Sequence, residues 1–206
     1  MIEGIIFDMD GVLVALNVSL EEMAKKAEDE VGVKPDSKGF RGILERAMRD
    51  GEFYRKLMKA IDELEVSAVE RRMTVFPETK RVIAHLGERY PLALVTLQGR
   101  KATERVLKKL GIKQFFKFIF TREDSFFRKE QIEKAVQALG IDKERILMVG
   151  DRRNDKVAAE EVGCKVVIVK REKQAAFEGA ALISSLDELP KVIERMNNRK
   201  EAGQPP

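Results

Sequence analysis

The feature that most constrains this chain is an acidic loop that follows a short apolar run: residues 4–7 read GIIF and residues 8–11 read DMDG. The run is typical of a buried strand, and it places Asp8 and Asp10 at the strand's C-terminal end. Carboxylates at the end of a buried strand cost free energy unless they are paired, protonated or bound to a cation. The segment therefore favours a Mg²⁺-type site, since Mg²⁺ takes oxygen ligands. A strand that ends in a solvated turn is the alternative.

Strands and helices alternate along the second part of the chain, from residue 76 onward. Short apolar runs predict the strands, and glycines such as Gly111 and Gly140 predict the ends of the intervening helices. The predicted strands cover residues 91–96, 146–149, 166–169 and 181–183, and a further strand is predicted within residues 115–121. This alternation is typical of an α/β fold in which helices wrap a parallel sheet.

The segment between the first strand and this alternating part predicts helices and no strand. Ser19 and Glu22 form a capping-box pattern that starts the first helix, and Gly32 stops it. Further helices are expected after Asp36 and from Gly51 to about Leu64, with residues 65–73 as a candidate fourth. We therefore expect an α/β core at 1–15 and 75–196, a small all-α domain at 16–74 and a flexible tail at 197–206.

Polar side chains follow three of the predicted strands at the same, C-terminal end. They are Asp8, Asp10, Thr96, Asp151 and Asp155. Because these ends meet along one edge of an open parallel sheet, residues distant in sequence are expected to become neighbours around a ligand. Four carboxylates and a hydroxyl predict a site for a cation and a phosphate group. The chain lacks the glycine-rich signatures of nucleotide-binding loops.

Composition excludes several other classes of protein. The 206 residues are 44% hydrophobic, enough for one sizeable core, and 39 basic residues are balanced by 35 acidic ones, which argues against nucleic-acid binding. A single cysteine, Cys164, excludes a disulfide framework, and the lone histidine, His85, lies in a predicted helix. No apolar run approaches bilayer length and no signal peptide is evident, so we expect a soluble cytoplasmic protein that does not bind membranes.

Three segments, taken together, resemble a known family. Residues 8–13 (DMDGVL), 94–96 (LVT) and 150–155 (GDRRND) look like motifs I, II and IV of the haloacid dehalogenase (HAD) superfamily. The helical insert resembles the C1 cap of its phosphoglycolate phosphatase and β-phosphoglucomutase-like branch. The resemblance implies a Rossmann-like core, Mg²⁺ as cofactor and a small phosphorylated metabolite as substrate.

The resemblance also implies a role for each residue. Asp8 would attack phosphorus, and Asp10 would protonate the leaving oxygen and then activate water. Mg²⁺ would be held by Asp8, the backbone carbonyl of Asp10, and Asp151, with Asp155 in or just behind that shell. Thr96 would donate a hydrogen bond to the phosphoryl group.

The chain departs from the family pattern at motif III, which supplies a lysine that balances charge. Residues 125–130 read SFFRKE without the usual Lys-Pro pair, and a gap-free alignment puts Phe126 at the lysine position. A dianionic phosphoryl group beside several carboxylates needs a cation. We predict that Lys129 supplies it, with Arg128 as the close alternative.

The predicted function is that of a Mg²⁺-dependent phosphatase that works through an aspartyl-phosphate intermediate. A phosphomutase on the same fold is one alternative. A non-catalytic protein that binds phosphate or a partner is another, in case motif III is defective. Dehalogenation is disfavoured, because a metal-free displacement of halide does not need the chemistry of Asp10. The protein is expected to be a monomer or a homodimer.

Overall fold

The computed structural model describes residues 1–171 and 179–198. The chain divides into two compact units: one comprises Met1–Ala15 together with the chain from Val75 onward, and the other comprises Leu16–Thr74. Of the predicted flexible tail, positions 199–206 lie outside the described residues. Position 197 belongs instead to the last helix, and Asn197 accepts a hydrogen bond of 2.6 Å from the backbone N–H of Ile2.

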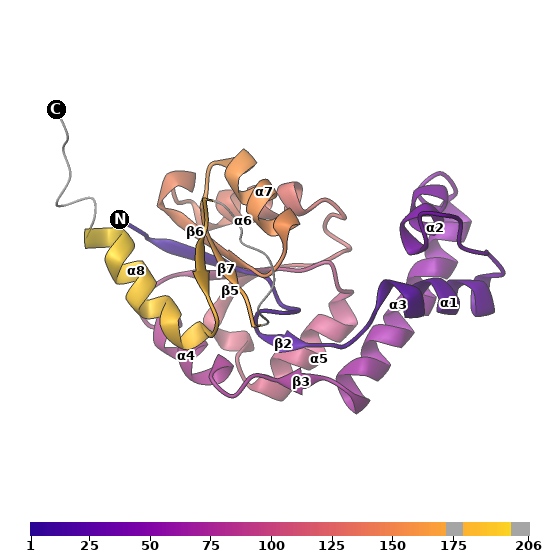
Figure 1. Ribbon diagram of the computed structural model, residues 1–206, viewed down its shortest axis with the longest axis horizontal. Coiled ribbons are helices and arrows are strands. Elements are labelled where there is room, and N and C mark those ends of the chain that lie inside the picture. The colour runs from indigo at the N-terminus through magenta and orange to yellow at the C-terminus, as the bar shows by residue number, and fades with distance from the viewer. Residues whose placement is uncertain (172–178, 199–206) are drawn as a thin grey trace. The chain divides into compact units, whose positions relative to one another are not determined.

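The larger unit is a parallel β-sheet with helices on both faces, which confirms the predicted α/β fold class (Figure 1). In the described residues the strand order is β5-β4-β1-β6-β7-β8, and every neighbouring pair is parallel. These strands are β1 (Gly4–Phe7), β4 (Leu92–Val95), β5 (Phe116–Phe120), β6 (Ile146–Gly150), β7 (Lys165–Val169) and β8 (Ala181–Ile183). The helices are α4 (Thr79–Gly87), α5 (Arg100–Leu110), α6 (Arg128–Leu139), α7 (Arg153–Val162) and α8 (Leu189–Asn198).

The central position of β1 explains its sequence. All four of its residues are buried, as a strand covered on both faces requires. Phe7 is in register with Leu94 of β4 on one side and with Val149 of β6 on the other. The residues that follow β1 therefore leave the sheet beside those that follow β4 and β6, where the strand order reverses and parallel sheets bind ligands.

Helices α6 and α7 cover one face of the sheet, and Figure 1 shows α4, α5 and α8 on the other side. Small and apolar side chains of the two helices pack on buried side chains of the strands. This packing holds the first turns of α6 and α7 near the C-terminal ends of the strands. The buried cluster includes Ile6, Met148, Ile168, Ile132, Ala135, Ala158 and Val162.

The smaller unit is helical and has its own core. It contains α1 (Leu20–Val31), α2 (Phe40–Ala47) and α3 (Gly51–Arg71), and the capping box of Ser19 and Glu22 at the start of α1 is confirmed. The candidate fourth helix is wrong as a separate element, because α3 runs through Leu64 and Glu65 to Arg71 without interruption. No glycine or proline lies at that point to end the helix. Short strands β2 (Val14–Ala15) and β3 (Thr74–Val75) form a separate two-stranded sheet.

The structure also locates the residues that composition singles out. Cys164 is buried, and burial raises the pKa of its thiol to about 11, as expected for a packed rather than a nucleophilic cysteine. His85 lies in the last turn of α4. Within residues 1–171 and 179–198, none of the helices is both long and apolar enough to cross a membrane.

Candidate active site

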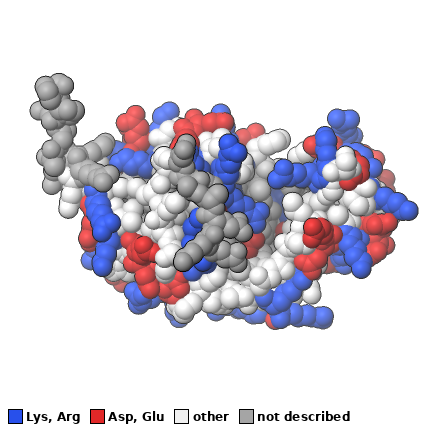
Figure 2. Space-filling model, viewed as in Figure 1, with Lys and Arg blue, Asp and Glu red and all other residues white. Residues whose placement is uncertain are grey.

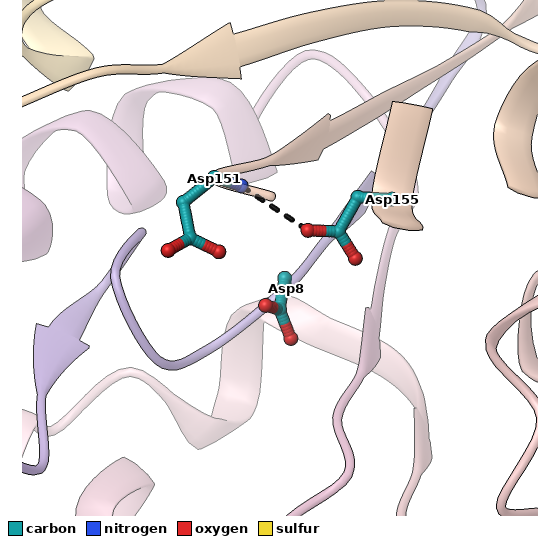
Figure 3. A group of neighbouring side chains, drawn as sticks. All are labelled: Asp8, Asp151 and Asp155. Carbon is teal, nitrogen blue, oxygen red and sulfur yellow. Dashed lines mark hydrogen bonds between the residues drawn. The ribbon is translucent and has the colours of Figure 1, made fainter. Parts of the chain in front are cut away.

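Three carboxylates meet at the ends of the central strands (Figure 3). Asp8 follows β1, Asp151 follows β6, and Asp155 lies in the first turn of α7. Each offers one oxygen atom, and these oxygens all lie within 4.8 Å of one another. Asp8 and Asp155 are buried and Asp151 is partly exposed, so the cluster opens to solvent on the side of Asp151.

Two glycines allow the carboxylates to approach so closely. Gly11 has a φ of +83°, and a Cβ atom there would overlap the carboxylate of Asp151. A Cβ atom at Gly150 would overlap the side chain of Asp155. Asp155 in turn accepts hydrogen bonds from the backbone N–H groups of Asp151 (3.2 Å) and Arg152 (3.0 Å), which fixes its carboxylate at the start of α7.

A buried arginine lies against this cluster. Arg128, the first residue of α6, is 7% exposed, and its Nη2 donates a hydrogen bond of 2.9 Å to Oδ1 of Asp8. Its Nε lies 2.9 Å from Oδ1 of Asp155, outside hydrogen-bond geometry. The guanidinium therefore compensates part of the negative charge of two buried carboxylates.

The donor set suits a hard divalent cation. Three carboxylates carry more negative charge than one guanidinium balances, and carboxylate oxygens are the ligands that Mg²⁺ prefers. In addition, Oδ1 of Asp151 is buried and has no hydrogen-bond partner in the structure. A buried acceptor without a partner is costly, and a bound cation would satisfy it.

The pKa values of two of these carboxyls are displaced. Burial raises the pKa of Asp8 to about 8, with Asp155 and Asp151 adding to the rise and Arg128 opposing it. Burial likewise raises the pKa of Asp151 to about 6; the charges of Asp155 and Asp10 contribute, while Arg152 opposes the rise. A bound cation would favour the ionised carboxylates and reverse both shifts.

We expect the stability of the metal-free protein to fall as the pH rises from about 4 to 8. In this window the native Asp8, with a pKa of about 8, holds a proton that the unfolded chain, with a pKa near 3.8, has lost. The native state therefore binds more protons, and the free energy of unfolding decreases with pH. Thermal unfolding in EDTA at several pH values measures this slope, which Mg²⁺ should flatten. A slope unchanged in Asp8→Asn would contradict this assignment.

Asp10 and Thr96, the other two residues predicted at this site, contact side chains outside the cluster. The Asp10 carboxylate is more exposed than that of Asp8, and its Oδ2 lies 3.7 Å from Nη2 of Arg152. Thr96 is fully buried after β4, and its hydroxyl is hydrogen-bonded to Oε1 of Gln98. A phosphoryl oxygen that bound to Thr96 would have to replace this Gln98 contact.

The two basic residues predicted to balance the charge, Lys129 and Arg128, have different environments in the structure. Lys129 is half exposed, and its Nζ lies 3.5 Å from Oε2 of Glu161 on α7. Arg128, the alternative, is the residue that contacts Asp8. The sequence-based prediction also missed Gln131, which is fully buried beside Arg128. Its spacing of three residues from Arg128 puts both on one helix face, which is the signal that could have found it.

A cavity of about 360 Å³ lies beside Asp151 in the larger unit. Arg171 lines it, stacks over the ring of Phe76 at 3.3 Å and pairs with Glu78 at 2.8 Å. The described lining residues are Gly11, Ala15, Phe76, Asp151, Val169, Lys170 and Arg171. The cavity gives a small molecule space next to the carboxylate cluster.

Comparisons with known proteins agree with this site and fold. The model of the haloacid dehalogenase-like hydrolase family matches residues 5–169. The chain is similar to a haloacid dehalogenase-like hydrolase of Streptococcus pneumoniae, with a TM-score of 0.70 and 20% identity over 93% of this chain and 98% of that one. With acidic side chains at the ends of a parallel sheet, the chain belongs to the haloacid dehalogenase-like hydrolases.

Curated relatives are similar over most of the chain. A phosphoglycolate phosphatase of Yersinia pestis is 26% identical over 81% of this chain and 80% of its own length. A phosphoglycolate phosphatase of Neisseria meningitidis is 26% identical over 97% of both chains. The chain is thus a phosphoric monoester hydrolase that resembles the phosphoglycolate phosphatase-like branch of this family.

Proposed function

We propose that the protein is a Mg²⁺-dependent phosphatase that hydrolyses a small phosphorylated metabolite in the cytoplasm through an aspartyl-phosphate intermediate. The observation that carries the proposal is the contact of Asp8 with Arg128 inside a cluster of three carboxylates. A carboxylate beside a cation, at the end of the central strand, is a suitable nucleophile for an anionic phosphate ester.

In the proposed first step, an Asp8 oxygen attacks phosphorus, and the bond from phosphorus to the leaving oxygen breaks. Asp10 gives its proton to that oxygen, so the product leaves as an alcohol. Asp8, the backbone carbonyl of Asp10, Asp151 and Asp155 are the groups proposed to hold Mg²⁺, which would offset the repulsion between the carboxylate and the phosphate.

In the proposed second step, Asp10 takes a proton from water as the water oxygen attacks the phosphorus of the acyl phosphate. The bond between phosphorus and Asp8 breaks, so inorganic phosphate leaves and both carboxyls return to their starting states. The partial exposure of Asp10 allows water to reach it, whereas Asp8 is almost completely buried. This difference supports the division of roles between the two residues.

Arg128 is proposed to stabilise the phosphoryl oxygens as charge develops on them, with Thr96 donating a further hydrogen bond. The guanidinium offers several N–H groups in a fixed plane, so it can contact Asp8 and a phosphoryl oxygen together. The non-catalytic alternative assumed that motif III lacks a working cation. The buried guanidinium of Arg128 beside Asp8 supports the catalytic function instead.

The proposed substrate is small and carries its phosphate at one end. The cavity beside Asp151 has a volume of about 360 Å³, at the lower end of the range for small-molecule sites. Relatives named phosphoglycolate phosphatase, and a pyrophosphatase of Bacillus mycoides that is 30% identical over 63% of this chain, make phosphoglycolate and pyrophosphate the first compounds to test.

We expect the purified protein to release phosphate from p-nitrophenyl phosphate with Mg²⁺ and to lose this activity when EDTA removes the metal. A panel of small phosphate monoesters, assayed for inorganic phosphate, then ranks substrates by kcat/KM. Excess Mg²⁺ after EDTA should restore the rate, which controls for irreversible damage. Absence of turnover over the whole panel would contradict the proposed function.

A further inference from the structure

The geometry points to Gln131 as a positioning residue that holds the Arg128 guanidinium in place while Asp8 changes its bonding. The inference rests on the proposed function, because the placement of Arg128 matters to catalysis where it faces a phosphoryl group. The inference is based on the contacts of the Gln131 carboxamide. This group is fully buried, and it contacts Arg128 with its oxygen and three backbone carbonyls with its nitrogen.

The nitrogen end of Gln131 joins three segments of chain. Nε2 lies 2.8 Å from the carbonyl oxygen of Thr96, 3.1 Å from that of Thr121 and 2.9 Å from that of Ser125. Thr96 follows β4, Thr121 follows β5, and Ser125 lies in the loop before α6. One side chain thus links the strand end that carries Thr96 to the loop that leads into Arg128.

The oxygen end of Gln131 faces the cation. Oε1 accepts a hydrogen bond of 3.2 Å from Nη1 of Arg128. Three acceptors on one side and a donor on the other require a side chain with a donor end and an acceptor end, and a carboxamide meets this requirement. Ionised glutamate cannot donate, lysine cannot accept, and an aliphatic side chain can do neither. The same neighbours determine which way the carboxamide is oriented.

Gln131 differs from the other groups around the guanidinium because it takes no part in the proposed chemistry. Nη2 of Arg128 contacts Asp8, which loses negative charge when it bonds to phosphorus, and Nε lies near Asp155, one of the proposed cation ligands. The contact with Gln131 is neutral and does not change between these states. It can therefore keep Nη1 in place through both steps, as preorganised catalysis requires.

The test replaces Gln131 with methionine, which has a similar volume and forms no strong hydrogen bonds. We expect Gln131→Met to lower kcat for p-nitrophenyl phosphate by about 10- to 100-fold, with a smaller change in KM, because misplacement of a catalytic group mainly affects the transition state. Thr103→Val is the matched control: Thr103 is fully buried, and its hydroxyl donates a hydrogen bond of 3.0 Å to the carbonyl of Gly99. This control should keep kcat within about twofold, since Thr103 contacts no proposed catalytic group.

A double-mutant cycle separates positioning from a purely structural role. Lysine lacks the planar guanidinium that Gln131 is inferred to hold in place. In the Arg128→Lys background, Gln131→Met should therefore lower kcat by less than about threefold. An equal factor in both backgrounds, or an unchanged kcat in Gln131→Met alone, would overturn the inference. If Gln131→Met does not fold, Gln131→Asn replaces it in the same cycle; asparagine keeps the carboxamide but withdraws it by one methylene.

A binding measurement distinguishes failure of this inference from failure of the proposed function. Calorimetric titration with inorganic phosphate in Mg²⁺ should show affinity about tenfold weaker in Gln131→Met than in Thr103→Val or the parent chain. If the parent chain hydrolyses no ester, the proposed function is wrong. The phosphate affinities of Gln131→Met and Thr103→Val then still test whether Gln131 positions Arg128. Equal affinities in the two variants would overturn it.

Discussion

Replacing Asp8 with asparagine is expected to lower kcat for phosphate esters by about 10³-fold or more, because the amide cannot form the acyl phosphate. The same change should not lower the stability of the metal-free protein. Burial raises the pKa of Asp8 to about 8, which means that the ionised carboxylate is unfavourable where it lies and that a neutral amide relieves this cost. Phosphate release in Mg²⁺ measures the first effect, and thermal unfolding in EDTA measures the second.

Asp187→Asn is the matched control for this variant. Asp187 is an exposed aspartate that pairs with Arg81 on the surface of the same unit, so its replacement should change neither turnover nor the melting temperature appreciably. Turnover by Asp8→Asn close to that of the parent chain would contradict the role of Asp8. A strongly lowered melting temperature would instead indicate that the Asp8–Arg128 contact is needed for folding.

Replacing Arg128 with alanine should impair both stability and catalysis. The change leaves the buried Asp155 carboxylate without its cation, and removing one partner of a buried ion pair costs about 3–5 kcal/mol. We also expect kcat/KM to fall by about 10²- to 10³-fold, the loss typical of removing a group that stabilises transition-state charge. Chemical denaturation and steady-state kinetics measure the two effects, and Mg²⁺ should recover part of the stability.

Lys129→Ala provides the comparison that decides between the two predicted cations. Its side chain is half exposed and contacts Glu161 at the surface, so its removal should change stability by less than about 0.5 kcal/mol. The activity should stay within about twofold of the parent chain. Loss of activity in Lys129→Ala together with normal activity in Arg128→Ala would reverse the assignment.

Much of the architecture was predictable because buried parallel strands have a recognisable sequence pattern. The run at residues 4–7 and the similar run at 146–149 are apolar throughout, since helices cover both faces of the sheet. The meeting of Asp8, Asp151 and Asp155 follows from the same geometry, because parallel strands end at one edge. By contrast, the prediction ended this helix too early: no glycine or proline follows Leu64, and α3 continues to Arg71.

The rotation of one helix decides which of the two basic side chains, Arg128 or Lys129, contacts Asp8. Successive residues of an α-helix point about 100° apart, so the exact start of α6 decides which of Arg128 and Lys129 faces the sheet. Helix boundaries are the least certain feature of a sequence-based prediction. The burial of Gln131 was equally hidden, because glutamine is usually exposed and its three carbonyl partners come from separate strand ends and loops.

The amino-acid sequence by itself determined that strands and helices alternate around a parallel sheet and that acidic side chains gather at its C-terminal edge. Strand periodicity and chain direction suffice for both conclusions. Only the tertiary structure decided that Arg128 donates one hydrogen bond to Asp8 and another to Gln131. These contacts depend on how α6 is rotated and seated against β1, β4 and β5, which the packing of side chains distant in sequence controls.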